Sequence, residues 1–357
     1  MLKILSVFIK TPIKIDESYE PKIAILLSVY NEIGFLEDCI ASILNSDYPN
    51  EKIRLLIGSD GSDDGSDEIL ENYANEHSNI EFYRLERGGK NSVLNSLMEK
   101  VKEEIVFFID ADTRLEPNTL IESVRPFGDN EIGVVLVRII NEGVTGQIDE
   151  SYYQKFESIL RDLESWIKST INSTGPFYGI RREMYENLED NRRCDDFVPV
   201  LKSVVSDKRV VYLNDTYARE YRPKSIDDEL GRRVRVSAGG LATIFSFPKL
   251  LNPFRLEGFF LWSHKLIRYL MPYTYLVSLL ISAMAFFFLG DTWGIAFVVF
   301  ILPLFLFVFG YVYSIMTKRN PNNKLFQYSE FLITMLYGIH LGWIGFFRNR
   351  NNAIWTH

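Results

Sequence analysis

The sequence has few of the residues that build disulfide frameworks or zinc sites. Only two of its 357 residues are cysteines, Cys39 and Cys194, and its four histidines show no paired spacing. These counts exclude a disulfide scaffold and a cysteine-rich zinc centre. Oxygen atoms would have to hold any metal ion, and oxygen ligands favour Mg²⁺ or Mn²⁺.

A surplus of positive charge is also absent. The chain carries 39 lysines and arginines against 47 aspartates and glutamates, which gives a formal net charge of −8. A general nucleic-acid binder normally shows a basic excess. We therefore expect no nucleic-acid partner.

Hydrophobic runs long enough to span a bilayer are absent up to about Arg255, whereas from Phe259 onward the chain is rich in Phe, Leu, Ile and Trp. The first ten residues, MLKILSVFIK, are apolar but too short to span a bilayer, and no small-residue cleavage site follows them. We expect residues 1–20 to form an interfacial anchor or, equally, a frayed terminus. The contrast divides the chain into a charged part typical of soluble proteins and an apolar part typical of membranes.

The charged part alternates apolar runs with helical patterns. Apolar runs occur at Ile23–Tyr30, Ile53–Gly58, Ile80–Leu85 and within Glu104–Pro117. Such alternation with short connections is typical of βαβ units joined by right-handed crossovers. It predicts an α/β fold with a Rossmann-like, mostly parallel, doubly wound sheet.

Polar residues follow each predicted strand, at Ser28–Glu32, Asp60–Asp64, Lys90 and Asp110–Asp112. Since ligands of parallel sheets bind beyond the carboxyl ends of the strands, we expect these groups to line one crevice. Two carboxylates separated by one residue can meet one divalent cation, or one can take a metal and the other a sugar hydroxyl. A solvated turn is the alternative for this short motif.

The same crevice contains groups suited to a nucleotide. Asp60 can accept an N–H from a pyrimidine edge, and Lys90 can neutralise a phosphate or hold a carboxylate. A diphosphate suits so acidic a crevice only if a divalent cation lies between them. Turn formation and helix capping account for Asp63, Asp64 and Asp67.

The ordered segments SVYNE, SDGSDDGS, GGKNSVLN and FIDADTRLEP resemble the nucleotide-sugar-binding half of family-2 inverting glycosyltransferases with the GT-A fold. The resemblance extends from Lys22 to about Leu120. It implies that a nucleotide is contacted by Ser28, Tyr30 and Glu32. It also implies that Asp60 contacts uracil, and that Asp110 and Asp112 hold the ribose, the diphosphate and the metal.

Acceptor-side residues are expected further along the chain. Gly175 and Phe177 belong to the segment STGPFYGIRR, which resembles the GxxxxxRR segment of hyaluronan and cellulose synthases; an ordinary tight turn is the alternative. The segment CDDF resembles the family's ED motif, which implies that Asp195 lies at the acceptor and that Asp196 is the base. Helix capping is the alternative for this pair.

A locally basic segment, ELGRRVRVSAGG, resembles the (Q/R)xxRW motif of processive synthases. The resemblance implies that Arg232 and Arg235 stabilise charge on the departing diphosphate of the donor. Val236 stands where the family has a tryptophan, and this departure weakens the inference of processive synthesis. A basic patch attracted to anionic lipid is the alternative.

The apolar part is expected to enter a membrane. Residues 246–271 suit amphipathic interface helices. Within 272–347 we expect two or three transmembrane helices, at Tyr273–Leu289, Trp293–Met316 and, less clearly, Phe331–Phe347. The basic loop after Met316 places the catalytic domain in the cytoplasm under the positive-inside rule, although the basic tail at 348–357 conflicts with a third span.

Together these patterns predict a glycosyltransferase domain at 21–245, with nucleotide-sugar binding at 21–120 and the acceptor side at 121–245. We expect a multi-pass protein of the inner (plasma) membrane. With Mg²⁺ or Mn²⁺ it would transfer a sugar from a UDP-sugar to a hydroxyl of a glycan or glycolipid. A polyprenyl-phosphate glycosyltransferase and a non-catalytic nucleotide-binding scaffold are the alternatives.

Overall fold

The computed structural model describes residues 11–142, 148–188, 194–221, 226–289, 308–309, 312, 316 and 324–348. The strands are β1 (Ile23–Val29), β2 (Ile53–Ser59), β3 (Ile80–Arg84), β4 (Ile105–Asp110), β5 (Thr113–Leu115), β6 (Ile132–Glu142), β7 (Phe177–Arg181) and β8 (Arg209–Tyr221). The helices associated with them are α2 (Leu36–Leu44), α3 (Ser66–Glu76), α4 (Lys90–Met98), α5 (Thr119–Val124), α6 (Ile148–Ile167) and α7 (Phe197–Val205). All four strands and the helices expected between them in the first third of the chain are therefore confirmed.

Eight strands of the described residues form one sheet, in the order β3-β2-β1-β4-β7-β6-β8-β5. The first four strands of this order are parallel to one another. By contrast, β7 is antiparallel to both β4 and β6, and β5 is antiparallel to β8. The expected mostly parallel sheet thus holds for the nucleotide-binding half, whereas the whole sheet is mixed.

Strand β7 was not predicted from the sequence, because glycines lie before it and inside it. The segment around it suggested a ligand-approaching loop, because Gly175, Pro176 and Gly179 lie within seven residues of one another. In the structure Gly179 lies inside the strand, where an added Cβ would be 2.5 Å from a ring carbon of Phe107. Close packing of the sheet against an aromatic ring, and not a ligand, requires this glycine.

Both faces of the sheet are buried, and β1 shows how. Its residues Ile23, Ile25 and Leu27 belong to the core beneath α2, whereas Ala24 and Leu26 belong to the core beneath α4. Successive side chains of a strand point to opposite faces. A strand covered on both faces must therefore be apolar throughout, which explains the unbroken hydrophobic run.

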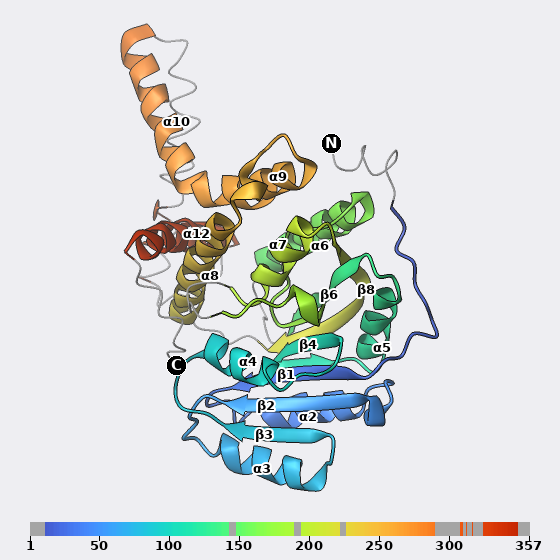
Figure 1. Ribbon diagram of the computed structural model, residues 1–357. Helices are drawn as coiled ribbons and strands as arrows, with labels where there is room; N and C mark the ends of the chain where they lie inside the picture. Colours follow the sequence, from blue (N-terminus) through green and yellow to red (C-terminus); the bar gives the residue numbers. More distant parts are fainter. Residues whose placement is uncertain are drawn as a thin grey trace.

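The C-terminal part is helical: α8 (Ile226–Ser246), α9 (Leu256–Phe260), the π-helical turn η5 (Leu261–Leu266), α10 (Ile267–Leu289) and α12 (Lys324–Phe347). The helix from Leu256 to Phe288 is the one helix of the described residues that is long and apolar enough to cross a membrane. Figure 1 shows α10 projecting away from the sheet, whereas α12 lies beside α8.

This arrangement bears on the expected transmembrane helices. The segment Tyr273–Leu289 lies in α10, whose apolar side chains are largely exposed, as a membrane segment would require. The segment Phe331–Phe347 lies in α12, which packs along α8. Most of Trp293–Met316 lies outside the described residues, as do residues 1–10 and 349–357, so the expected number of spans and the N-terminal anchor stay predictions.

Candidate functional site

The polar ends of β1 and β4 meet at one edge of the sheet. In the register of these parallel strands Ser28 lies opposite Asp110. The amide N–H of Asp110 donates to the carbonyl of Pro176 at 2.9 Å, which ties this edge to the loop before β7. The hydroxyl of Ser28 is buried and has no hydrogen-bond partner among the described residues. The predicted meeting of strand ends is therefore confirmed here.

Asp60 organises the glycine loop before α4. Its carboxylate is fully buried and accepts hydrogen bonds from the amides of Gly88 at 2.7 Å and Gly89 at 3.0 Å. Arg87 donates to the same carboxylate at 3.0 Å, and its guanidinium carbon lies 3.1 Å from the centroid of the Tyr30 ring. Asp60, expected at the uracil, and Tyr30, expected at the nucleotide, are thus joined by Arg87.

Lys90 connects the DAD motif with the downstream acid pair. Its Nζ lies 2.7 Å from Asp110 Oδ1 and 2.9 Å from Asp195 Oδ2. Burial lowers the pKa of Lys90, but the two carboxylates outweigh it and raise that pKa above its usual value. The structure therefore brings together residues separated by more than one hundred positions in the sequence, as the predicted site requires.

Negative charge is concentrated at Asp112. Burial, Asp110, Glu220 and Glu32 together raise the pKa of Asp112 to about 8. Burial, together with Asp110 and Asp64, also raises the pKa of Glu32 to about 7. A cation placed among these carboxylates would relieve their repulsion, so the charge distribution fits a divalent metal ion.

The DAD motif supplies two carboxylates, Asp110 and Asp112. Among the described residues, no group of three or more histidine, cysteine, aspartate or glutamate side chains could hold a metal ion by itself. Mg²⁺ is commonly held by one or two carboxylates, with substrate phosphates and waters completing its coordination. Asp110 and Asp112 would be the one or two carboxylate ligands of such an ion. Asp110 also contacts Lys90.

Asp196 lies at the start of α7, but its side chain makes no capping hydrogen bond. Burial and the neighbouring Asp195 raise the pKa of Asp196, while a hydrogen bond from Ser173 and the charge of Lys265 oppose this increase. Gly175 lies close by in the left-handed region (φ +81°), and a Cβ there would be 3.6 Å from Asp196 Oδ2. The carboxylate of Asp196 is therefore not used as a helix cap, and the backbone at Gly175 lies close to it.

Phe177 is a core residue. Its side chain is fully buried and stacks on Phe107 with ring centroids 5.4 Å apart, so the ring offers no surface to a sugar. Because β7 is antiparallel to β4, Phe177 lies opposite Ile109 at the DAD end while Arg181 lies opposite Ile105 at the other end. The two arginines of the GxxxxxRR-like segment are therefore remote from the acid pair.

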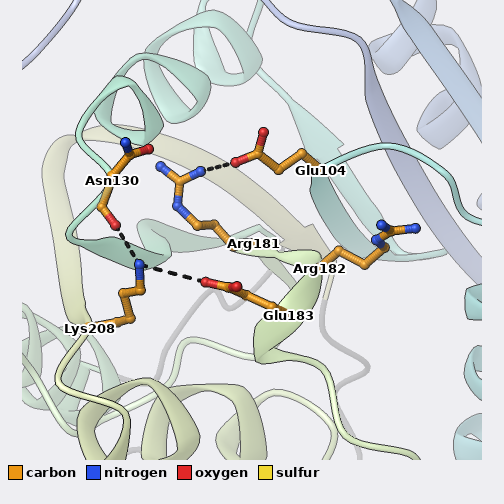
Figure 2. A pocket seen from close by; sticks show the side chains of 6 residues that line it. All are labelled: Glu104, Asn130, Arg181, Arg182, Glu183 and Lys208. Carbon is orange, nitrogen blue, oxygen red and sulfur yellow. Dashed lines mark hydrogen bonds and ion pairs between the residues drawn. The ribbon is translucent and has the colours of Figure 1, made fainter.

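These arginines line a different cavity, shown in Figure 2. Arg181 forms an ion pair with Glu104 and donates to backbone carbonyls, among them that of Ile132 at 2.8 Å. Lys208 lies 3.6 Å from Glu183. The positive side chains of this cavity are paired with carboxylates or backbone carbonyls. The cavity lies at the amino end of β4, at the edge of the sheet opposite the DAD motif, and we interpret it as a structural feature.

Arg232 and Arg235 both lie on α8. The exposed side chain of Arg235 contributes positive charge at Asp110, where it opposes the upward shift of the pKa of that carboxyl caused mainly by burial. Arg232 is half-buried one turn earlier on the same helix. The structure thus gives Arg235 an electrostatic connection to the DAD motif, while the contact of Arg232 with a donor stays a prediction.

Sequence reasoning missed Arg87, Tyr178 and Lys265. Arg87 adjoins the recognised glycine loop, so its position could have suggested it. Tyr178 is buried near the acid pair with a hydroxyl that has no hydrogen-bond partner among the described residues, and it was hidden by the misjudged β7 segment. Lys265 looked like the polar face of an interface helix, and only the three-dimensional packing places its Nζ 4.4 Å from the ring centroid of Phe197, the residue after Asp196.

Comparison with known proteins agrees with this geometry. Residues 24–189 match the family model described as Glycosyl transferase family 2. Poly-beta-1,6-N-acetyl-D-glucosamine synthase of Staphylococcus epidermidis is 25% identical over 236 residues, which cover 64% of this chain and 57% of that protein. Glycosyltransferase GlyA of Streptococcus pneumoniae is 25% identical over 221 residues, covering 58% of this chain and 32% of that protein. The matches therefore span less than two thirds of each relative.

A solved structure resembles nearly the whole chain. The mannosyltransferase PcManGT of Pyrobaculum calidifontis, determined in complex with GDP-Man and Mn²⁺, has a TM-score of 0.72 and 19% sequence identity, covering 98% of this chain and 94% of that one. At this identity the likeness establishes the fold alone. Residues 24–189, a little under half of the chain, are therefore similar to glycosyl transferase family 2, and the chain has the fold of this solved structure.

Proposed function

We propose that the chain is a divalent-metal-dependent, inverting glycosyltransferase that moves a sugar from a UDP-sugar to a hydroxyl of a glycan or glycolipid at a membrane. The observation that carries the proposal is the contact of Lys90 with both Asp110 and Asp195. Because one lysine side chain contacts both carboxylates, this observation supports a single site formed by the DAD motif and the downstream acid pair. A shared site of this kind is what direct transfer between two substrates requires.

On the donor side, the nucleobase would occupy the region of Tyr30 and Asp60. Arg87 covers the Tyr30 ring and holds Asp60, so it would move aside or stack on the base when the donor binds. The buried hydroxyl of Ser28 would gain a partner from the donor. Asp110 and Asp112 would hold Mg²⁺ or Mn²⁺, which when bound would neutralise the diphosphate.

On the acceptor side, Asp196 would accept the proton of the attacking hydroxyl. Inverting transfer requires a base on the face opposite the leaving group. Burial favours the protonated form of Asp196 and so makes its carboxylate a better proton acceptor. Arg235 would stabilise the negative charge that develops on the departing diphosphate. Asp195 would keep Lys90 oriented between the two substrates.

Attachment to a membrane would follow from α10. Its outward residues are apolar and exposed, with Leu280 63% and Phe287 77% accessible to solvent. Burying them in lipid would remove a large apolar surface from water. Because the catalytic domain and α10 are joined through η5, a glycolipid acceptor could reach Asp196 from the membrane surface.

The test is turnover of UDP-sugars by the full chain in detergent or lipid nanodiscs. With Mn²⁺ present we expect release of UDP from at least one of UDP-glucose and UDP-N-acetylglucosamine, and loss of this release with chelator. Asp196→Asn should reduce transfer by at least about a hundredfold. The matched variant Glu51→Gln, an exposed acid on the far side of the sheet, should leave it unchanged.

Two outcomes would contradict the proposal. Donor binding without turnover under all these conditions would indicate a non-catalytic scaffold. Full activity of Asp196→Asn with undecaprenyl phosphate as acceptor would indicate a lipid-phosphate acceptor, since an ionised phosphate needs no base.

A further inference from the structure

One aromatic side chain projects from the protein surface just before the long helix that ends in α10. Phe254 is 97% exposed, the largest value among the exposed large hydrophobic side chains of the described residues. It lies in the turn between the short helix η4 (Pro248–Leu251) and α9. Single exposed apolar residues are common on soluble proteins, so the surroundings of Phe254 decide its role.

The turn that carries Phe254 is held in one shape. The amide of Phe254 donates to Asn252 Oδ1 at 3.0 Å, and Nε1 of Trp262 donates to the carbonyl of Leu251 at 2.9 Å. A Cβ at Gly258 would lie 1.9 Å from the carbonyl oxygen of Asn252, so only glycine lets α9 pack this closely on the turn. The turn therefore presents Phe254 at a fixed position relative to α9.

The helix that follows the turn is fastened to the catalytic domain. Glu257, which is 6% exposed, forms an ion pair with Lys168, the residue after α6. In η5, Nδ1 of His264 lies 2.9 Å from Glu164 Oε1 on α6, and the next-to-last turn contributes the fully buried Leu261 to the core. The position of Phe254 is therefore fixed relative to the catalytic domain as well.

Exposed apolar surface resumes where this packed segment ends. Ile267 at the start of α10 is 55% exposed, and Leu280 further along is 63% exposed. A helix rises by about 1.5 Å per residue, which places Ile267 roughly 15–20 Å along the chain direction from Phe254. Figure 1 shows α9 at the end of the molecule from which α10 projects, on the side farthest from β3. Two apolar features therefore stand at the two ends of one packed segment.

The charges around Phe254 favour an anionic surface. From Phe245 to Leu256 the sequence contains two basic residues, Lys249 and Arg255, and no acidic residue, although the whole chain has a net charge of −8. Both basic side chains are exposed. Basic residues next to a membrane helix are attracted to anionic headgroups, while an aromatic ring can enter the boundary between headgroups and acyl chains. This combination matches the surface of a bilayer that contains anionic lipid.

We infer that Phe254 inserts into the interface of an anionic bilayer and forms a second membrane contact besides α10. The inference rests on the proposed attachment of the chain to a membrane through α10. A single helix in lipid leaves the attached domain free to tilt and to turn about the helix axis. Since Phe254 is tied rigidly to the catalytic domain, its insertion would hold the sheet at one orientation to the bilayer.

The experiment measures lipid contact with the fluorophore NBD on the full chain in nanodiscs of phosphatidylglycerol and phosphatidylcholine. The label is attached to Phe254→Cys, to Leu280→Cys in α10 or to Glu51→Cys, an exposed position just before β2. Each variant also carries Cys194→Ser, whereas Cys39 is fully buried and shielded from the reagent. The chain without an introduced cysteine corrects for residual labelling.

Nitroxide-bearing lipid should quench the label at position 254 at least about threefold more than the label at position 51, and aqueous iodide should show the reverse order. Quenching at position 254 should also be stronger in discs with phosphatidylglycerol than in discs of phosphatidylcholine alone. The double variant Lys249→Gln, Arg255→Gln should abolish this difference between lipids. A difference that persists in the double variant, or none in the wild type, would overturn the choice of anionic lipid.

A label at position 254 that lipid nitroxides do not quench, while the label at position 280 is quenched, would overturn the inference and leave α10 in the membrane. Shielding of position 254 from both nitroxide lipid and iodide would also overturn it, because that result indicates a protein contact such as a second copy of the chain. Absence of lipid quenching at both positions would remove the membrane attachment itself. Failure of the proposed sugar transfer is separate, since these measurements require no turnover.

Discussion

The proposed donor half and the proposed acceptor half of the site are built by different means. The proposed donor groups Ser28, Asp60 and Asp110 stand at or directly after the ends of adjacent parallel strands, so the sheet itself fixes their spacing. The proposed acceptor groups Asp195 and Asp196 lie at the start of α7, and Asp195 reaches the donor side through its ion pair with Lys90. Backbone pairing therefore positions one half, whereas a side-chain ion pair connects the other half to it.

This difference has a physical consequence. Strand pairing is cooperative and resists single substitutions, whereas a buried charge cluster loses much of its stability when one member is removed. We therefore expect substitutions on the proposed donor side to keep the fold while changing ligand binding and the electrostatic part of stability. Substitutions on the acceptor side should change both chemistry and local structure.

The largest effect is expected for Asp112→Asn, which tests the donor half. Removing the carboxylate where negative charge is most concentrated should weaken metal-dependent donor binding and lower turnover by about 10²–10³-fold. Calorimetric titration of UDP with and without Mn²⁺ measures the binding, and UDP release measures turnover.

In metal-free buffer at pH 8 this variant should unfold at a higher temperature than the wild type, because it lacks the burial cost and the repulsion that raise the pKa of Asp112. Asp207→Asn is a suitable control, because Asp207 is exposed and asparagine tolerates its left-handed backbone (φ +57°). Unchanged Mn²⁺ dependence in Asp112→Asn would argue against metal binding at this motif.

Lys90→Met tests the connection between the two halves. Since Lys90 contacts Asp110 and Asp195 together, its loss should weaken donor binding and also lower transfer, by roughly a hundredfold in turnover over KM. Asp195→Asn should lower transfer while leaving UDP binding intact.

The double variant measures whether the two residues act as a unit. Coupled residues give a double effect smaller than the sum of the single effects, when each is expressed as a free energy. Strict additivity would mean that Lys90 serves the donor alone and that the ion pair with Asp195 is incidental.

The two halves also differed in how far the sequence could predict them. The parallel strands and their polar ends followed from hydrophobic runs, because a strand buried on both faces must be apolar. The strands β6 and β7 were not predicted from the sequence. The reason is clear for β7, because its Gly179 is required by close packing on Phe107, which is distant in sequence.

Residues of the acceptor half were predictable only where a motif marked them. Asp195 and Asp196 were proposed through their resemblance to a family motif, whereas no local signal marks Lys265, which packs on the ring of Phe197 beside them. Phe177 showed the opposite error, because resemblance to an acceptor-side segment predicted a contact with the acceptor, whereas the side chain is fully buried in the core. Side chains that meet through long-range packing of helices leave little trace in a single sequence.

Glu32→Gln tests how much the crowded negative charge of the proposed donor half destabilises the folded protein. The pKa of Glu32 is raised to about 7 in the folded protein, so ionisation disfavours the folded state as the pH rises from about 4.5 toward 7. In metal-free buffer the variant should therefore be more stable than the wild type by about 2 kcal/mol at pH 8, allowing for partial exposure, and equally stable near pH 4.

Thermal unfolding at the two pH values measures this difference. Glu37→Gln, an exposed glutamate in the first turn of α2, provides the control and should show no such pH dependence. A stabilisation of Glu32→Gln that is the same at both pH values would point to packing and not to charge.

The smallest effect, expected for Gly175→Ala, tests whether the acceptor half depends on backbone freedom. Gly175 has a φ of +81°, which costs a residue with a Cβ about 1 kcal/mol, while the added methyl would make an ordinary contact with Asp196. We expect a fall in unfolding temperature of a few degrees and a several-fold loss of transfer, with UDP binding unchanged. Gly34→Ala is the matched control, since Gly34 has neither a positive φ nor atoms within 4 Å of an added Cβ. Equal losses of UDP binding and transfer in Gly175→Ala would mean that this loop serves both halves of the site.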